Sequence, residues 1–263
     1  LMAGIPMSKQ PYIHIGNYVP DAFKEPEKQG KVRGPRPGEK EWDESNMSLP
    51  HSSPHASVNA TPASAADTAE DWESLDPKDV AYVLIEYCCS PNSSLCSEKY
   101  ATQDNKKVAR IRLTEKHDLT KQAGLDYAMR ALHHFAECGP KIFLWASVPC
   151  TGGCGWQHVN KYQCANHTAN QAYHFRTFNK LYHNFMKLAT EVRALKGKIA
   201  WEWPDNNSMW KFPKIRKMIK IFDLVPVRFH GCAVGCMSKD NKPHKKPWKF
   251  VTDIEDLRKR FKN

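Results

Sequence analysis

The feature that most constrains the fold is an alternation of short apolar runs with amphipathic helical patterns, which begins after Asp76-Pro77. Five runs are rich in β-branched and aromatic residues, as expected of buried strands: 80–87, 107–113, 142–148, 199–203 and 225–229. Three segments between them repeat apolar residues at helical spacing: 125–136, 169–195 and 208–222. This alternation predicts an α/β fold with a doubly wound, mostly parallel sheet. A run at 248–251 predicts a last, antiparallel strand.

Residues 1–75 have a different composition, and we expect no hydrophobic core in them. They hold nine of the eighteen prolines, and 48–68 consists mostly of Ser, Ala, Pro, Thr and His. Such a segment buries too little apolar surface to offset the entropy lost on ordering it. The sequence therefore predicts a disordered arm over 1–75, with a short ordered patch near 12–18, followed by one domain over 76–263.

The net charge of +11 is concentrated at the carboxyl-terminal end of the chain. Residues 211–263 contain fifteen Lys and Arg against five Asp and Glu, and the remainder is almost neutral. A basic end of this kind suits a polyanion such as nucleic acid, and the alternative is an ordinary solvated face. The candidate phosphate contacts are Lys242, Lys245, Lys246 and Lys249.

The nine cysteines bear on the compartment in which the protein works. Residues 1–10 lack the continuous apolar run of a secretory leader, and no stretch approaches the roughly 20 apolar residues of a membrane span. We therefore expect reduced thiols, no membrane partner and a nuclear or cytoplasmic setting.

Five unusual segments follow predicted strands: 86–90, 115–118, 149–153, 202–204 and 231–235. In a doubly wound sheet the ligand lies beyond the carboxyl ends of the strands. The order and placement of these five segments, more than any one of them, indicate a shared site.

Their order resembles the Rossmann-like catalytic domain of S-adenosylmethionine-dependent methyltransferases, and the DNA cytosine-5 branch is nearest. The similarity covers about 80–252 and rests on order and spacing, with few identical residues. It lies in an acidic, Cys-containing turn at 86–94, Pro149-Cys150, Glu202-Trp203-Pro204, and 233–235 followed by Lys245-Lys246. The resemblance implies S-adenosylmethionine as cofactor and a set of cofactor-binding residues: Glu86, Cys88, Ser90, Asn92, Ser93, Glu115, Asp118 and Pro149.

The sequence also departs from that family. Residues 91–94 are Pro-Asn-Ser-Ser where the family has glycines, and only about a dozen residues separate Gly235 from Trp248, too few for a target-recognition domain. The 149–153 loop is equally similar to that of RNA cytosine-5 methyltransferases. Those enzymes have Thr-Cys where this chain has Glu202-Trp203, which favours the DNA-type assignment.

The resemblance implies a mechanism for cytosine methylation. Cys150 would add to the ring as a thiolate, its pKa lowered by adjacent backbone N–H groups. Glu202 would protonate the ring nitrogen of a base that has left its stack. The alternative for Cys150 is a small buried residue near a tight turn. If the strand is regular, Trp201 and Trp203 share the face opposite Glu202.

Two further interpretations remain open. The first is a zinc site with an irregular ligand spacing, formed by Cys150, Cys154, Cys164 and His167, with Cys232 and Cys236 as further candidates. The second is a non-catalytic, nucleic-acid-binding relic of a methyltransferase fold, for example a segment of a larger polyprotein. Cys88 and Cys89 are expected to pack in the core.

Overall fold

The computed structural model describes residues 72–163, 165–238 and 241–261, so the predicted arm up to residue 71 lies outside the described residues. Its centre is a seven-stranded sheet with the order β2-β3-β1-β4-β5-β7-β6. The strands are β1 (Val80–Tyr87), β2 (Thr102–Gln103), β3 (Lys106–Leu113), β4 (Lys141–Ala146), β5 (Lys198–Pro204), β6 (Val225–His230) and β7 (Pro247–Thr252).

The sheet is mixed but mostly parallel. Strands β3, β1, β4 and β5 run in one direction. Strand β7 is antiparallel to both of its neighbours, β5 and β6, and the short β2 is antiparallel to β3. The predicted α/β class, the mostly parallel sheet and the antiparallel last strand are therefore confirmed.

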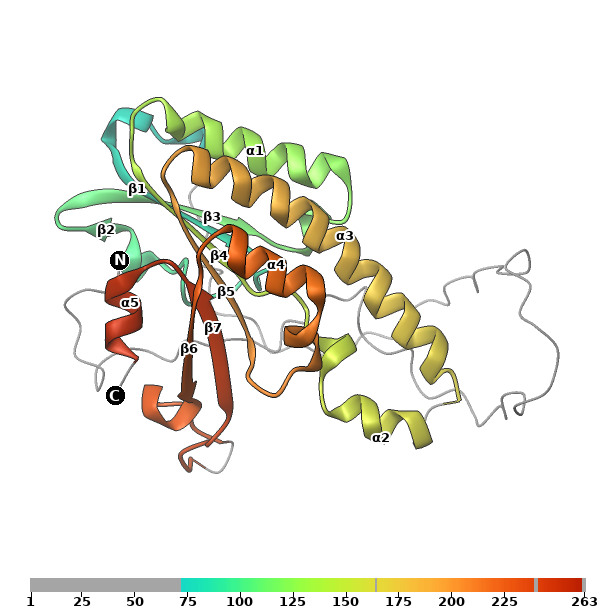
Figure 1. Ribbon diagram of the computed structural model, residues 1–263. Helices are drawn as coiled ribbons and strands as arrows, with labels where there is room; N and C mark the ends of the chain where they lie inside the picture. Colours follow the sequence, from blue (N-terminus) through green and yellow to red (C-terminus); the bar gives the residue numbers. More distant parts are fainter. Residues whose placement is uncertain (1–71, 164, 239–240, 262–263) are drawn as a thin grey trace, which may run out of the picture.

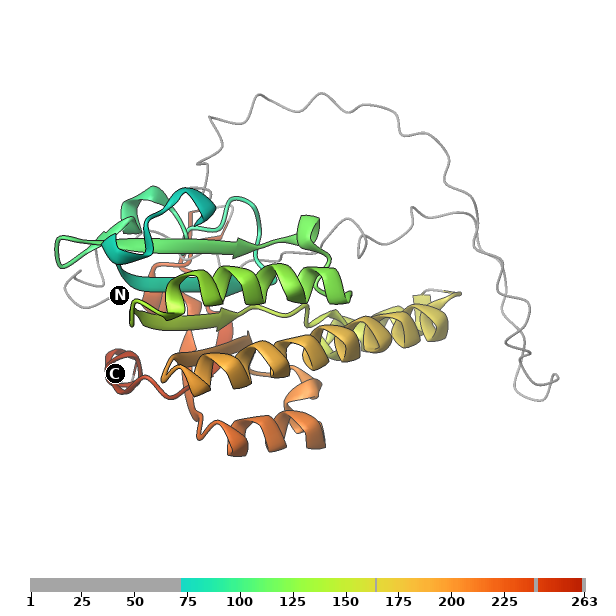
Figure 2. The ribbon, with the colours of Figure 1, turned by 90° about the horizontal axis from the view of Figure 1, so that it is seen from above.

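The helices cover the two faces of the sheet unequally. They are α1 (Gln122–Ala136), α2 (Trp156–Gln163), α3 (His167–Ala194), α4 (Pro213–Ile221) and α5 (Glu255–Arg260). Helices α1, α3 and α4 lie side by side over one face (Figure 1, Figure 2) and share one hydrophobic cluster with it. On the other face, α5 contributes Leu257 to a separate cluster with Trp145 and Phe250. The sheet is thus covered by helices mainly on one side.

The missing cover on the second face follows from the connection after β1. The segment between β1 and β2 contains only a three-residue 3-10 helix, Glu98–Tyr100. The side chains of Ser90 and Ser93 accept hydrogen bonds from the backbone N–H groups of Asn92 and Leu95, both 3.3 Å long. Such local bonds compete with helix formation.

The cluster under α1, α3 and α4 is centred on aromatic side chains. Trp201 packs edge-on against Trp203 and Phe185, with ring centroids 5.0 Å and 4.7 Å apart. Successive residues of a strand point to opposite faces, so Glu202 lies on the other side of the sheet from both tryptophans. The prediction that Trp201 and Trp203 share the face opposite Glu202 is confirmed.

The domain begins earlier than the predicted boundary at residue 76. Trp72 and Leu75 are buried in the main cluster. The indole Nε1 of Trp72 donates to the hydroxyl of Tyr127 at 2.8 Å, and the backbone carbonyl of Leu75 lies 3.0 Å from Nε2 of His134. The composition of the arm hid this start because two apolar residues within a polar segment have no periodicity.

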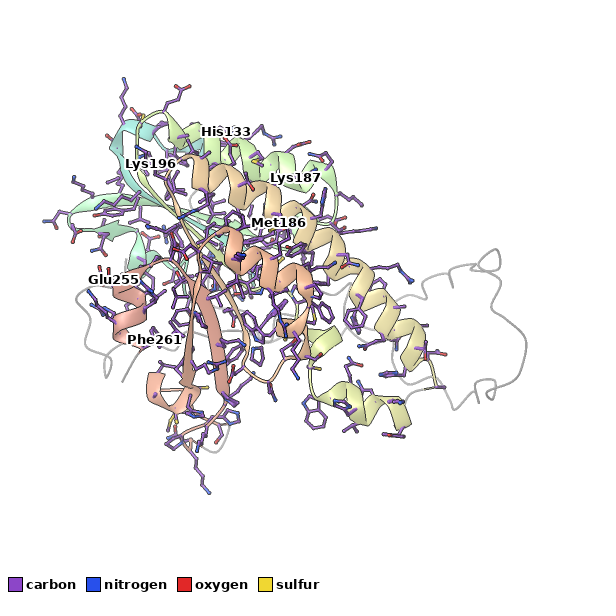
Figure 3. The ribbon with its side chains drawn as sticks, viewed as in Figure 1. His133, Met186, Lys187, Lys196, Glu255 and Phe261 are labelled. Atoms are coloured by element: carbon purple, nitrogen blue, oxygen red, sulfur yellow. The ribbon has the colours of Figure 1, made fainter. Side chains whose placement is uncertain are left out.

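The second face carries a cavity of about 240 Å³ near α5. Its lining includes Tyr82, Phe143 and Lys198, which lie in the amino-terminal halves of their strands. Phe261, just after α5 (Figure 3), packs on Phe229 and Phe250 with centroids 4.9 Å and 5.2 Å apart. Because the amino-terminal strand ends lie opposite the segments singled out from the sequence, this cavity is not the candidate site.

In the part of the chain that is described, no helix has the length and apolar character needed to cross a membrane.

The early start of the domain predicts a stability effect. Trp72→Ala should lower the free energy of unfolding by about 3 kcal/mol, because it empties a buried site and leaves the Tyr127 hydroxyl without its donor. Chemical denaturation of the full chain measures this. Trp156→Ala is the matched control, since Trp156 is 72 % exposed, and should change stability by less than about 0.5 kcal/mol. Equal stability of the two variants would place Trp72 outside the folding unit.

Candidate active site

The candidate site lies where β1, β4 and β5 end side by side. Glu86 pairs in register with Trp145, and Trp145 pairs with Ala200. Cross-strand partners share a face, and so do residues two apart in a strand, so Glu86 and Glu202 project from the same face. This is the face opposite α1, α3 and α4. Both carboxyl groups are about 5 % exposed.

Glu202 is held as a neutral acid. Burial raises its pKa from 4.5 to about 8, against the smaller opposing effects of a hydrogen bond with Ser147 and the charge of Lys246. The Ser147 hydroxyl accepts from the indole Nε1 of Trp145 at 2.9 Å, and Glu202 Oε2 has no hydrogen-bond partner. A carboxylic acid with this pKa can donate a proton at neutral pH.

Glu86 is the second buried acid. Burial raises its pKa to about 7, while hydrogen bonds from Ser93, Cys96 and Cys89 oppose the shift. The Ser93 hydroxyl donates to Oε1 at 2.5 Å. The proximity of Glu86 also raises the pKa of Glu202.

Cys150 lies on the loop after β4, where it is half-buried against the cluster under α1, α3 and α4. Its backbone angles, φ −99° and ψ 6°, fall in the sparsely populated bridge region where many active-site residues occur. Burial, with smaller contributions from Glu202 and Cys154, raises the pKa of its thiol to about 12 against the opposing charge of Lys246. A backbone hydrogen bond lowers this pKa, as predicted, but burial outweighs it, so the predicted net lowering is wrong.

The loop around Cys150 is held by side chains from four other segments. Five of its carbonyl groups accept hydrogen bonds, which come from Trp203 to Val148, Asn207 to Cys150, Gln157 to Thr151, Gln171 to Gly152 and Ser208 to Gly153. A Cβ on Gly153 would overlap Asn207 and Met209, so the loop and the 3-10 helix Ser208–Lys211 pack as closely as glycine permits. The position of the thiol is therefore set by many independent bonds.

The basic residues predicted to bind phosphate fall into two groups, exposed lysines and lysines directed toward other side chains. Lys242 and Lys245 are exposed on the segment before β7. Lys246 instead reaches the site, acts on both Cys150 and Glu202, and lies 4.3 Å from the ring centroid of Trp248. Lys249 is directed inward: its Nζ lies 3.4 Å from Asp205 and 4.1 Å from the ring centroid of Trp210. With only 11 % of its side chain exposed, Lys249 is not a phosphate contact.

The predicted cofactor-binding residues gather at the same edge but differ in access. Ser90 and Pro149 are half-buried, whereas Asn92 and Glu115 are exposed. Cys88, Ser93 and Glu86 are buried. Cys88 has φ 61°, an unusual conformation for a residue other than glycine. Asp118, with φ 37°, accepts from Thr120 and pairs with Lys121 at 2.9 Å, so it stabilises its own turn.

The zinc alternative finds no support among the residues described. No three His, Cys, Asp or Glu side chains of that part of the chain are gathered for a metal ion. Cys150, Cys154 and His167 are therefore not brought together as ligands, and neither are Cys232 and Cys236 with a third group. Cys164 lies outside the described residues. Cys88 and Cys89 are buried, as expected of core residues.

Comparisons with protein-family models, curated proteins and solved structures found no match to this chain.

Sequence reasoning missed several residues of the site. Ser147 and Trp145 orient Glu202, Asn207 holds the Cys150 loop, and Gln157 and Gln171 reach that loop from α2 and α3. Asn207 carried one signal, an Asn just after the 202–204 strand end. The two glutamines carried none, because a single polar residue on a helix indicates nothing about its partner.

The raised carboxyl pKa values predict a pH dependence of stability. Folding takes up protons wherever the pKa is higher in the folded than in the unfolded chain, so each acid makes the free energy of unfolding fall as pH rises above its ordinary value. The fall is at most about 1.4 kcal/mol per pH unit for each group. For Glu202 the window runs from 4.5 to about 8, and Glu202→Gln should remove its share of the slope.

Denaturant titrations across that window measure this slope. Glu86→Gln should remove the part that ends near pH 7, and the double variant should remove both parts. A Glu202→Gln protein that keeps the wild-type slope would contradict the assignment of Glu202 as a buried neutral acid.

Proposed function

We propose that this chain is a Rossmann-like, S-adenosylmethionine-dependent methyltransferase that acts on cytosine in nucleic acid. The observation that carries the proposal is that Cys150 follows β4 and Glu202 lies near the end of β5, the adjacent parallel strand, while Lys246 precedes the antiparallel β7 at the same edge. Burial raises the pKa of Glu202 to about 8. A thiol and a proton-donating acid at one edge are the pair that addition to a cytosine ring requires.

The chemistry divides between these residues. The thiol of Cys150 first loses its proton to a water molecule. The sulfur then forms a bond to the ring carbon beside C5 as the double bond between that carbon and C5 breaks, and the ring nitrogen takes the proton of Glu202, so that the ring becomes enamine-like at C5. Lys246 offsets the carboxylate that this transfer leaves behind. When the methyl group is in place, the C5 proton passes to a water molecule, the sulfur departs as a thiolate and the ring-nitrogen proton returns to Glu202, which restores the aromatic ring and the acid.

The cofactor would supply an electrophilic methyl group on a sulfonium. Among the predicted contacts, Ser90, Asn92 and Glu115 are accessible beside the ends of β1 and β3 and are suited to bind its polar parts. Glu86, Cys88 and Ser93 are buried and bonded among themselves or to their surroundings, so they are suited to shape the turn rather than to contact a ligand. The accessible residues among the predicted contacts therefore fit S-adenosylmethionine, and the buried ones do not.

The sheet topology supports the proposal as well. Ligands of open α/β sheets bind beyond the carboxyl ends of the parallel strands, and the candidate residues follow β1, β3, β4 and β5 at that edge. The antiparallel β7 lies between β5 and β6, and its preceding segment brings Lys246 to the same edge. The basic segment that precedes β7 thus adjoins the chemistry.

One observation favours the second candidate function, a non-catalytic nucleic-acid-binding relic. A thiol with a pKa of about 12 is almost entirely protonated at neutral pH, and the thiolate is the nucleophile. Catalysis therefore requires that substrate binding change the surroundings of Cys150. If no such change occurs, the basic segment binds nucleic acid and the site is inert.

Transfer of a labelled methyl group to cytosine-containing DNA and RNA tests the proposal. Cys150→Ser should abolish transfer and keep the rise in melting temperature caused by S-adenosylmethionine. Glu202→Gln should slow transfer by about 100-fold or more, because it removes the acid. Cys138→Ser is the matched control, since that thiol is exposed and precedes the amino-terminal end of β4, at the opposite edge of the sheet, and should transfer normally. If the wild type shows neither methyl transfer nor stabilisation by millimolar S-adenosylmethionine, the non-catalytic relic is the function.

The basic segment predicts a salt-dependent affinity for nucleic acid that is separate from methyl transfer. Lys245→Glu should weaken binding of all sequences alike and reduce the slope of log affinity against log salt by about 1, because one phosphate contact is lost. Lys106→Glu, at the amino-terminal end of β3, makes the same charge change at the opposite edge and should leave the slope unchanged. Equal slopes for the two variants would exclude this segment as the phosphate-binding surface.

A further inference from the structure

The pair formed by α2 and the first half of α3 projects beyond the sheet (Figure 1, Figure 2). None of the described α2 side chains is buried, and in the 28-residue α3 the buried residues begin only at Thr177. Most helical stability in proteins comes from packing an apolar face. Up to Arg176 this pair packs one partly buried ring, Phe175, against Phe212 and the main cluster, while its other large apolar side chains are exposed.

Those side chains are exposed to an unusual degree. The described residues include five large apolar side chains that are exposed, and four of them belong to this pair: Trp156, Val159, Tyr162 and Tyr173. Trp156 is 72 % and Tyr162 84 % exposed, whereas six other described tryptophans are at most 7 % exposed. The fifth, Ile221, is at the end of α4. Aromatic rings are thus gathered on one projection.

The charge of this part of the chain has one sign. The sequence contains no Asp or Glu between Glu137 and Glu191, while Lys161, Arg176 and Lys180 lie on α2 and α3. The core of a protein–protein interface is depleted in charged residues, so exposed rings interleaved with cations suit a polyanion better than an apolar protein partner. Rings with cations between them are the arrangement that binds single-stranded nucleic acid.

The projection is joined directly to the candidate site. Gln157 of α2 donates to the carbonyl of Thr151 at 2.9 Å, and Gln171 of α3 donates to the carbonyl of Gly152 at 2.5 Å. Both carbonyls belong to the loop that carries Cys150. A nucleic-acid strand bound along α2 would therefore run toward the loop that carries the thiol of Cys150.

We infer that α2 and the first half of α3 form a docking surface for an unpaired nucleic-acid strand. Bases stack on Trp156 and Tyr162, and Lys161 and Arg176 bind the phosphates. A duplex hides the faces of its bases, so stacking selects the single strand. The inference deepens the proposed function by naming the form of its substrate, and binding can be measured whether or not methyl transfer occurs.

Fluorescence anisotropy of the full chain with a labelled, mixed-sequence DNA strand of about 20 nucleotides tests this inference. The Cys150→Ser background and the absence of cofactor separate binding from catalysis. Trp156→Ala and Tyr162→Ala should each weaken binding about tenfold, and Trp156→Phe should keep most of it because the ring face remains. Ile221→Ala, the matched exposed apolar control on α4, should bind as the parent does.

The same variants are then titrated with the annealed duplex and examined by sedimentation. Parent-like duplex affinity for Trp156→Ala, together with weakened single-strand affinity, supports the inference. Equal single-strand affinity for Trp156→Ala, Tyr162→Ala and the parent would overturn it. So would a parent dimer that Trp156→Ala dissociates without loss of nucleic-acid affinity, because the rings would then form a contact between two copies of the chain.

Discussion

Parallel pairing of β1, β4 and β5, with both faces of each strand buried, is the constraint on which the rest of the structure depends. One face is filled by the aromatic cluster of Trp201, Trp203 and Phe185 under α3. The other face must then bury whatever the alternate positions carry, and near the strand ends these positions carry Glu86 and Glu202. Desolvation raises the pKa of both acids, so the site follows from the packing of the sheet.

This burial has opposite consequences for the two groups that the proposed chemistry needs. It keeps Glu202 protonated at neutral pH, as a proton donor requires, but it also keeps the thiol of Cys150 protonated. Lys246 lowers the pKa of both groups and is the described cation that acts on each. A substrate that displaced the thiol from its buried position would favour the thiolate, whereas loss of the charge on Lys246 would favour the inert state.

Buried contacts are distributed unevenly over the molecule, and we place nucleic-acid binding where these contacts are few. The core lies between the sheet and the layer of α1, α3 and α4, while none of the described side chains of α2, or of α3 before Thr177, is buried. Their contact with the body consists of polar bonds to the loop of Cys150 and the packing of Phe175 on Phe212. Regions with few buried apolar contacts open at low free energy, which suits a segment that has to accommodate a ligand.

Alternation and helical spacing are local properties of the chain, so the sequence predicted every strand but β2, the helices α1, α3 and α4, and the edge of the sheet at which unusual residues gather. It did not reveal α2, which has no buried face, nor Trp72, whose partners Tyr127 and His134 lie far along the chain. Folding alone brings the charge of Lys246 near Cys150, turns Lys249 toward Asp205 and buries the thiol of Cys150, which raises its pKa. Burial and through-space charge decide these properties, and both depend on residues that meet only after folding.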